Sequence, residues 1–168
     1  YEKFNKEQTE KIKKEGQDIS PNLYYMKQTV SNACGTVAII HAIANNVAQL
    51  EMGDGDLKKF IDSTKDLSAD EKAEKLETDE GISVAHEASA QEGQTETPSI
   101  DVKVDLHFVA LIHKDGILYE LDGRKEFPIN HGKTSSESFL KDGARVCQEF
   151  MKRDPNEVHF TVVALCDV

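Results

Sequence analysis

The sequence predicts an α+β fold in which helices flank a central antiparallel β-sheet. Apolar residues recur at helical spacing in "CGTVAIIHAIANNV", and "TSSESFLKDGARVCQEFMKRDP" has helix start and stop signals. Between these stretches, "LHFVALI" and "ILYEL" are apolar enough for strands and are connected through "KDG", a hairpin turn signal. The chain has 168 residues and is 38% hydrophobic, which suits one domain with one core.

The first third of the chain predicts a helix, a loop and a second helix. Residues 1–18 are charged and have a weak helical pattern, and Pro21 then favours extended backbone in the residues before it. A helix begins at Asn32, because Ser31 and Asn32 are good N-cap types and apolar residues follow at helical spacing as far as Val47. The glycines of "MGDGD" end this helix.

The middle of the chain predicts more helix and then a long polar loop. Residues 57–80 have a helical pattern that starts afresh at Ser68, where Ser68 and Glu71 have the spacing of a capping box. The acids of residues 54–80 indicate either a solvated helix face or a docking surface for a basic partner. Residues 87–105 have neither the helical nor the strand period, which is typical of an active-site lid or of a floppy surface insertion.

The last part of the chain predicts a hairpin, a helix and a final strand. One face of the first strand is formed by alternate apolar residues, namely Leu106, Phe108, Ala110 and Ile112. "ILYEL" is the return strand of the hairpin, and the following helix ends before Pro155. "EVHFTVVALC" is apolar on both faces, which predicts a central strand that is covered on both sides.

Composition excludes some function classes and favours others. There are 31 acidic and 20 basic residues, a net charge of −11, which argues against binding to nucleic acids and to anionic membranes and favours a partner with a basic face. No apolar run approaches the length that spans a bilayer. The three cysteines, Cys34, Cys147 and Cys166, are odd in number and form no CxxC pair, so we expect reduced thiols in the cytoplasm or the nucleus.

Cys34 stands where the chain changes from loop to helix, and this placement favours a reactive thiol. The N-terminus of a helix presents unpaired N–H groups and the positive end of the helix dipole, both of which lower the pKa of a thiol. Gly35 next to it allows a substrate to come close to the backbone. Cys34 is therefore a candidate nucleophile, and the alternative is a buried cysteine that serves as a small apolar side chain. A nucleophile needs a base, a group that orients the base and an oxyanion donor.

Three residues are candidates for these roles. His107 begins the first strand, and Asp122 follows the return strand, so an antiparallel hairpin places them side by side. Gln28, six residues before Cys34, carries an amide that can donate to an oxyanion. The alternatives are that Asp122 is only a turn residue of an Asp-Gly pair, and that His107 is only a strand histidine. His41 lies on the apolar stripe of its helix and is interpreted as a core histidine.

A metal site is a further alternative. Cys34, His41, His107 and His113, together with nearby acids, contain ligand types for zinc. Structural zinc sites usually show paired ligands at short spacing, and this sequence has no such pair. The sequence therefore predicts neither a metal nor another cofactor.

Three blocks of the chain resemble the ubiquitin carboxyl-terminal hydrolases, papain-like thiol deubiquitinases of the short, single-domain type. The blocks are "QTVSNACGTVAIIHAIAN" at 28–45, "HEASAQEGQTETPSIDVKVDLHFVALIH" at 86–113 and "LYELDGRKEFPINHG" at 118–132, and they occur in this order. The resemblance implies a papain-like cysteine hydrolase fold, with residues 1–168 as a single catalytic domain. It also implies that the domain is N-terminally incomplete, because two strands that precede the matched region in the family are absent.

The resemblance assigns a role to each candidate residue. Cys34 looks like the nucleophile of the family, His107 like its general base, and Asp122 like the carboxylate that orients the histidine. Gln28 resembles the oxyanion-hole residue, where the backbone N–H of Cys34 is the second donor. The implied reaction removes small adducts or short peptides from the C-terminal glycine of ubiquitin through a thioester acyl-enzyme.

The resemblance also assigns a role to the long polar loop. Residues 87–105 look like the crossover loop of the family, which limits access to slender leaving groups. This loop includes Glu87, Gln94, Pro98 and Asp101, and either Glu87 or Asp101 is a candidate to contact the arginine of the modifier's Arg-Gly-Gly end. The implied partner is ubiquitin or a ubiquitin-like modifier. The alternative function is a fragment that binds ubiquitin without turnover.

Overall fold

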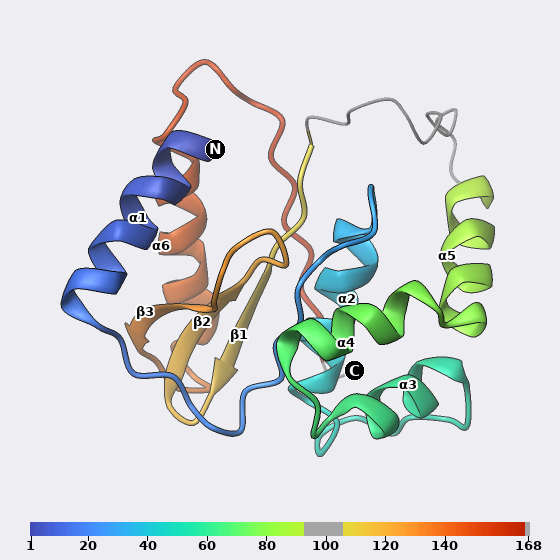
Figure 1. Cartoon of the computed structure of the whole chain (residues 1–168). Helices are drawn as coiled ribbons and strands as arrows, with labels where there is room; N and C mark the ends of the chain where they lie inside the picture. Colours follow the sequence, from blue (N-terminus) through green and yellow to red (C-terminus); the bar gives the residue numbers. More distant parts are fainter. Residues whose placement is uncertain (93–105, 167–168) are drawn as a thin grey trace.

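The computed structural model describes residues 1–92 and 106–166 (Figure 1). Its elements in chain order are α1 (Glu2–Glu15), α2 (Cys34–Ala44), α3 (Asp56–Thr64), α4 (Ala69–Glu77), α5 (Glu80–Glu92), β1 (Ala110–Lys114), β2 (Ile117–Leu121), β3 (Ile129–Lys133) and α6 (Phe139–Met151). Within the described ranges, three antiparallel strands form one sheet in the order β1-β2-β3. Helix α2 contacts β1 and helix α6 contacts β2, so the predicted α+β architecture is confirmed.

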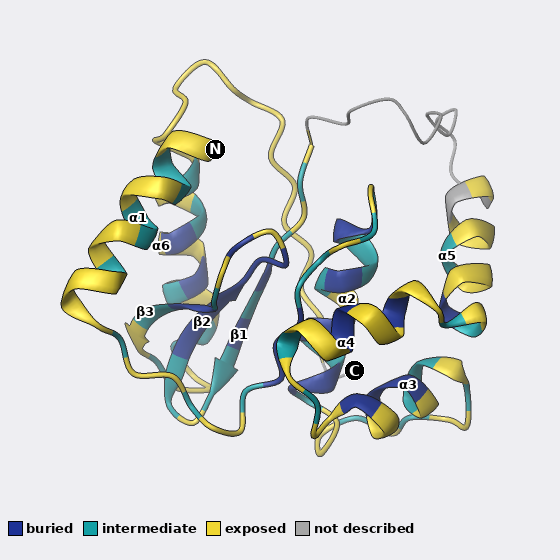
Figure 2. Ribbon diagram, viewed as in Figure 1, coloured by how far each residue is buried: buried dark blue, intermediate teal, exposed yellow. Residues whose placement is uncertain are grey.

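The segment 23–28 contributes to both halves of the core. Tyr24 and Met26 pack into an apolar cluster with residues of α2, α3, α4 and α5, whereas Tyr25 packs into a second cluster on β1 and β2. This alternation has the period of extended backbone. In Figure 2, α2 and β2 both carry buried residues, and residues of both elements belong to these clusters. The segment therefore brings Gln28 to the boundary between the helices and the sheet.

Helix α2 begins at Cys34, two residues later than predicted. Asn32 has a φ of 57°, in the left-handed region that asparagine tolerates, so it turns the chain instead of capping the helix. Ala33 takes the N-cap position and makes no side-chain capping bond. The N-cap roles predicted for Ser31 and Asn32 are therefore wrong, but Cys34 does occupy the first helical position, where its N–H has no partner within the helix.

Helix α2 ends at Ala44, earlier than the predicted end beyond Val47. The Oδ1 atom of Asn45 accepts the N–H of Tyr24, and its Nδ2 donates to the carbonyl groups of Tyr24 and His41, each at 2.8 Å. An asparagine that bonds to the backbone of a neighbouring segment competes with continuation of the helix. Val47 consequently lies outside the helix and is exposed.

The predicted helical region 57–80 contains all but the first residue of α3, all of α4 and the first residue of α5. The restart at Ser68 is confirmed, because its side chain accepts the N–H of Glu71 while the Glu71 carboxylate accepts the N–H of Ser68. The next break has a cap that the sequence analysis missed. Asp79 Oδ1 accepts the N–H of Ile82 at 2.8 Å and so caps the start of α5.

The predicted loop 87–105 is wrong over its first part. Residues 87–92 continue α5, so Glu87 is a helical residue. Once the Asp79 cap has started a helix, each further residue adds a hydrogen bond, so weak periodicity does not prevent propagation. Residues 93–105, which include Gln94, Pro98 and Asp101, lie outside the described residues.

The predicted hairpin is confirmed, with a shorter first strand. Asp115 and Gly116 both have positive φ, 49° and 78°, as a type I′ turn requires. Strand β1 begins at Ala110, whereas the prediction began it at Leu106 and placed His107 within it. His107 lies in the segment that leads into β1. Strand β3 was not predicted, because Asn130 and Gly132 are poor strand formers, and a register shift interrupts its pairing with β2.

The final strand predicted in "EVHFTVVALC" is wrong. Within residues 1–92 and 106–166, the stretch 157–166 is not assigned to any strand, and Figure 1 draws it as a plain trace after α6. Its apolar side chains are exposed, up to 86% for Val163. A strand requires a neighbour whose N–H and C=O groups pair with its own, and the described sheet provides none for this stretch. Apolar composition alone therefore led to a wrong strand prediction.

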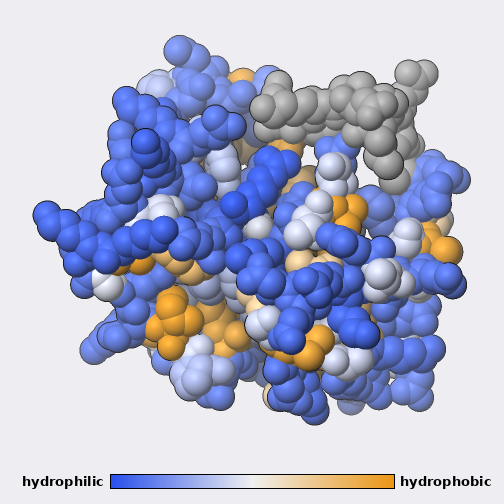
Figure 3. Space-filling view, in the orientation of Figure 1, coloured by the Kyte–Doolittle hydropathy of each residue, from blue (hydrophilic) through white to orange (hydrophobic). Residues whose placement is uncertain are grey.

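The surface agrees with the acidic, charge-rich composition. The face drawn in Figure 3 is mostly hydrophilic, with smaller apolar patches between the hydrophilic regions. None of the helices in the described part of the chain is long and apolar enough to cross a membrane.

Candidate active site

Asp122 is the fixed point of the candidate site, because the turn that follows β2 holds it from several directions. Its side chain is almost fully buried, and its Oδ1 accepts the backbone N–H of Arg124 at 2.9 Å. The hydroxyl of Tyr25 lies 3.0 Å from the carbonyl oxygen of Asp122 and 2.6 Å from that of Lys125. The turn is therefore anchored through both side chain and backbone.

His107 reaches Asp122 from the segment before β1. Its Nε2 lies 2.7 Å from Asp122 Oδ1, so the ring N–H donates to the carboxylate. Burial raises the pKa of Asp122, but the bonds from His107 and Tyr1 outweigh this effect and hold that pKa below its usual range. Burial lowers the pKa of His107, but the Asp122 carboxylate and the Cys34 thiol raise it above its usual value. The pair therefore favours an imidazolium beside a carboxylate.

Tyr1 completes the surroundings of the carboxylate. Its hydroxyl donates to Asp122 Oδ2 at 2.5 Å, and its ring meets the His107 ring edge-on with centroids 5.4 Å apart. Burial and the contact with Asp122 raise the pKa of Tyr1, so its hydroxyl keeps its proton and stays a donor. Sequence analysis did not identify Tyr1 as a site residue. No local pattern indicates that a tyrosine before α1 contacts a turn more than a hundred residues further along the chain.

The Cys34 thiol lies at the start of α2 and interacts with the same imidazole. Burial raises the pKa of Cys34, but the interaction with His107, the backbone N–H of Phe108 and the charges of His107 and Arg124 outweigh it, so the pKa is lowered. His107 Nδ1 is buried and has no hydrogen-bond partner of ordinary geometry among the described residues. Because Nε2 is occupied by Asp122, Nδ1 is the nitrogen that remains for the thiol. The arrangement can form a thiolate–imidazolium pair.

Gln28 lies beside the Asp122 turn. Its backbone N–H donates to the carbonyl of Gly123 at 2.8 Å, and its Nε2 donates to the carbonyl of Val30 at 3.1 Å. A side-chain amide has two N–H groups, so one remains for an incoming oxyanion. The structure thus brings Cys34, His107 and Asp122 together and places Gln28 at the edge of this group.

His41 and His113, the two further histidines considered as metal ligands, have other partners. His41 is fully buried, its Nε2 lies 3.1 Å from the N–H of Met26, and its ring stacks on Tyr25. Burial lowers its pKa to about 4, so it is a neutral core residue at neutral pH. His113 packs against Phe139. Over residues 1–92 and 106–166, no three or more His, Cys, Asp or Glu side chains are arranged to hold a metal ion.

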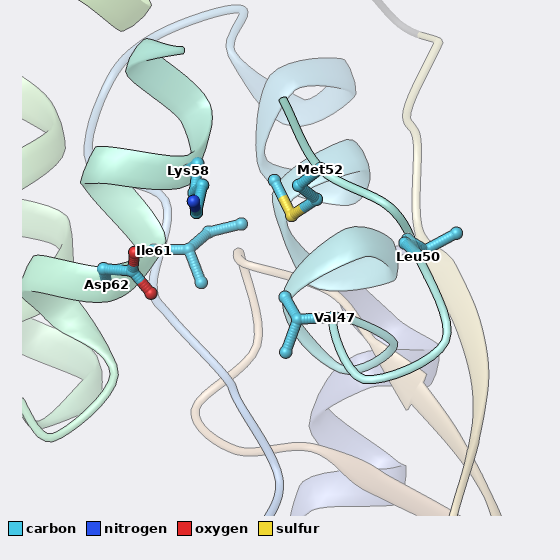
Figure 4. Close-up of a pocket in the computed structure, with 6 residues that line it drawn as sticks. All are labelled: Val47, Leu50, Met52, Lys58, Ile61 and Asp62. Carbon is cyan, nitrogen blue, oxygen red and sulfur yellow. The ribbon is translucent and has the colours of Figure 1, made fainter. Parts of the chain in front are cut away.

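A separate cavity of about 270 Å³ lies between α3 and the turn that follows α2. It is lined by Val47, Leu50, Met52, Lys58, Ile61 and Asp62 (Figure 4). None of the candidate catalytic residues lines it, so its size is no guide to the reaction. The chemistry is indicated by the thiol, imidazole and carboxylate, which together suit nucleophilic acyl transfer.

Comparisons with known proteins place this geometry in a family. The family model for ubiquitin carboxyl-terminal hydrolase, family 1, matches residues 1–152. A ubiquitin carboxyl-terminal hydrolase of Drosophila melanogaster is 53% identical over 165 residues, which are 98% of this chain and 72% of that protein. The isozyme L1 of Sus scrofa is 50% identical over 167 residues, covering 99% of this chain and 73% of that protein.

A solved structure has the same fold. The catalytic domain of Trichinella spiralis UCH37, bound to ubiquitin vinyl methyl ester, superposes with a TM-score of 0.64 and 24% identity over 89% of this chain and 68% of that one. At this identity the likeness shows the fold alone. It supports the papain-like version of the predicted α+β architecture.

Proposed function

The chain belongs to the ubiquitin carboxyl-terminal hydrolases of family 1, and from this premise we propose that Cys34, His107 and Asp122 perform its thiol hydrolysis. The observation that carries the proposal is the 2.7 Å bond between His107 Nε2 and Asp122 Oδ1, beside a thiol whose pKa is lowered. A cysteine hydrolase needs a thiolate at neutral pH and a proton donor next to it, and this trio supplies both.

Acylation uses Cys34, Gln28 and His107. The Cys34 thiolate attacks the carbonyl carbon of the C-terminal glycine of ubiquitin, and the carbonyl oxygen becomes an oxyanion. The backbone N–H of Cys34, which has no partner within α2, and the Gln28 amide donate to that oxyanion. His107 then gives its proton to the leaving group, the bond to the leaving group breaks, and a thioester remains on Cys34.

Deacylation reverses the proton transfers. His107, now neutral, takes a proton from water, and the hydroxide attacks the thioester carbonyl. The C–S bond breaks, free ubiquitin leaves, and the thiolate–imidazolium pair is restored. Asp122 keeps its charge throughout, since its part is to orient the ring and to stabilise the imidazolium.

Ubiquitin is the proposed partner in this reaction. The relatives with 53% and 50% sequence identity are named as ubiquitin carboxyl-terminal hydrolases. The structural neighbour was solved with bound ubiquitin vinyl methyl ester. The net charge of −11 suits a partner with a basic face. The proposal covers ubiquitin and ubiquitin-like modifiers alike.

Release of a fluorophore from the C-terminus of ubiquitin tests the assignment. We expect Cys34→Ala to lose turnover by at least about 10³-fold, because the nucleophile is removed. Cys147→Ala is the matched control, since Cys147 is a half-buried free thiol on α6, and its turnover should stay within about twofold of wild type. A ubiquitin with an electrophilic C-terminus should label Cys34 alone.

Two outcomes contradict the proposal. Unchanged turnover in Cys34→Ala would show that Cys34 is not the nucleophile. Binding of free ubiquitin in a calorimeter without any turnover by the wild-type chain favours the alternative of a ubiquitin-binding fragment.

A further inference from the structure

Gly123, directly after Asp122, is the point where the turn carrying the carboxylate touches the segment carrying Gln28. The carbonyl of Gly123 accepts the backbone N–H of Gln28 at 2.8 Å. On the other side lies α2, whose first residue is Cys34. Three parts of the proposed site therefore meet at one residue without a side chain.

The contact leaves no room for a side chain. A Cβ added to Gly123 would lie 2.8 Å from Cβ of Gln28, 3.0 Å from the backbone nitrogen of Gln28 and 3.0 Å from Cγ1 of Val37 on α2. Carbon atoms in contact prefer about 3.5–4.0 Å, so the neighbours would have to move by several tenths of an ångström. The backbone of Gly123 is not in the left-handed region, so close approach, rather than an unusual φ, is what favours glycine here.

The two sides of this contact are not equally firm. The turn is held by the Tyr25 hydroxyl, by the bond from His107 to Asp122 and by the buried ion pair between Lys125 and Glu120. Residues 25–27 are held as well, by the same Tyr25 hydroxyl, by the bond from Met26 N–H to His41 and by the bonds of Lys27 to Ala69 and Asp70. Gln28 itself, at the end of this segment, is bonded through its N–H to Gly123 and through its side chain to Val30. A side chain at residue 123 should therefore displace Gln28 and leave Asp122 in place.

We propose that Gly123 is a positioning residue that sets the place of the Gln28 amide relative to the Cys34 thiol. The inference rests on the proposed function, in which Gln28 donates to the oxyanion. Its effect is felt in the transition state, where the oxyanion forms, and a displacement of about 1 Å can cost about 10²-fold in rate. The His107–Asp122 pair, held on the firm side, keeps its geometry. We expect Cys34 to keep its place beside the imidazole, because α2 meets the added Cβ through a side-chain methyl of Val37 and not through its backbone.

The first test compares Gly123→Ala with Gly53→Ala. Gly53 has nothing within 4 Å of an added Cβ, so its variant controls for the loss of a glycine. We expect kcat of Gly123→Ala on the ubiquitin fluorophore substrate to fall by about 10- to 100-fold with KM within about threefold, and Gly53→Ala to match wild type.

Two further readouts separate positioning from general damage. Alkylation of Cys34 by iodoacetamide, followed by peptide mapping across pH, should keep the wild-type rate and pH dependence in Gly123→Ala, because the thiolate–imidazolium pair is intact. In a double-mutant cycle, Gly123→Ala should add little to Gln28→Ala, because the amide that it displaces is already absent.

Each contrary result overturns the inference. These results are turnover of Gly123→Ala within about twofold of wild type, a changed pH dependence of Cys34 alkylation, or losses that multiply in the double variant. If Gly123→Ala does not fold, the same comparison is made in a Val37→Ala background, which removes one of the three contacts. An inactive wild type, or an active Cys34→Ala, is instead the failure of the proposed function itself.

Discussion

Two buried carboxylates stand two residues apart on β2 and its end, and each is paired with a histidine. Glu120 Oε2 lies 2.8 Å from His131 Nε2, and Asp122 Oδ1 lies 2.7 Å from His107 Nε2. Both carboxylates are about 1% exposed. They differ in the second partner: Glu120 also pairs with the buried ammonium of Lys125, whereas Asp122 accepts from the neutral hydroxyl of Tyr1.

The second partner distinguishes the pair that we propose to be reactive from the one that we expect to be structural. The charge of Glu120 is already balanced by Lys125, whose Nζ also donates to Gln8 on α1. The charge of Asp122 is not balanced by a fixed cation, so it remains available to stabilise an imidazolium at His107. We therefore expect reactivity to depend on leaving one buried carboxylate, Asp122, without a permanent counter-ion.

The largest expected effect is on turnover when each histidine is removed. His107→Ala should lower kcat by at least about 10³-fold, because the proton donor and acceptor of the reaction is lost. His131→Ala should leave kcat within about threefold and cost about 1–2 kcal/mol of stability, because Glu120 keeps Lys125 as a partner. The comparison breaks if the two variants lose similar amounts of turnover in the ubiquitin fluorophore assay.

Removing the ammonium of Lys125 tests the structural role that we assign to the Glu120 pair. Lys125→Met should destabilise the chain by about 3 kcal/mol at neutral pH, because a buried Glu120 is left undercompensated. The pKa of Glu120 is held below its usual range by His131 and Lys125 against the effect of burial, so the stability it contributes is present above about pH 4.3 and is lost as pH falls. The gap between wild type and variant in urea unfolding should therefore shrink toward acid pH, and a constant gap would contradict this account.

Removing the charge of Asp122 tests the reactive role that we propose for its pair with His107. Asp122→Asn should lower kcat by about 10²-fold, less than Cys34→Ala does, because the orienting residue does not itself attack. The pKa of His107 is raised partly through Asp122, so without the charge it falls, and the imidazolium is lost at lower pH. We expect the alkaline limb of kcat/KM to move to lower pH, and equal profiles for variant and wild type would remove Asp122 from the site.

Local chemistry was readable from the sequence, and long-range chemistry was not. The capping box of Ser68 and Glu71 and the turn at Asp115 and Gly116 follow from neighbouring residues, so the sequence predicted both. The placement of Cys34 at a helix start was predicted in the same way. The proximity of His107 to Asp122 was predicted through the hairpin, although His107 lies before β1 and not within it.

The remaining features depend on contacts between distant segments. The bond from Tyr1 to Asp122, the approach of Gly123 to Gln28 and the pairing of Glu120 leave no periodic trace in the sequence. The strand expected at 157–166 failed for the related reason that pairing depends on a neighbour, which apolar composition does not reveal. The roles assigned to the site residues remain predictions until the variants are measured.

The smallest expected effect concerns the neutral partner that distinguishes the two carboxylates. Tyr1→Phe keeps the ring against His107 and removes only the hydroxyl that donates to Asp122 Oδ2. Because Tyr1 is partly exposed, water replaces some of the lost bond, and we expect a loss of about 1 kcal/mol in unfolding free energy near neutral pH. The matched control is Phe4→Leu, which changes a nearby aromatic residue in the first turn of α1.

The pH dependence of this loss identifies its cause. Tyr1 helps to hold the pKa of Asp122 below its usual value, so its contribution is present above about pH 4 and is lost as pH falls through the folded-state pKa. The difference between Tyr1→Phe and wild type should therefore fade in acid, whereas the loss in Phe4→Leu should not. If the loss of unfolding free energy in Tyr1→Phe persists unchanged in acid, the hydroxyl acts through packing and not through the charge of Asp122. The contrast between the neutral partner of Asp122 and the charged partner of Glu120 would then no longer explain why we expect only the Asp122 pair to be reactive.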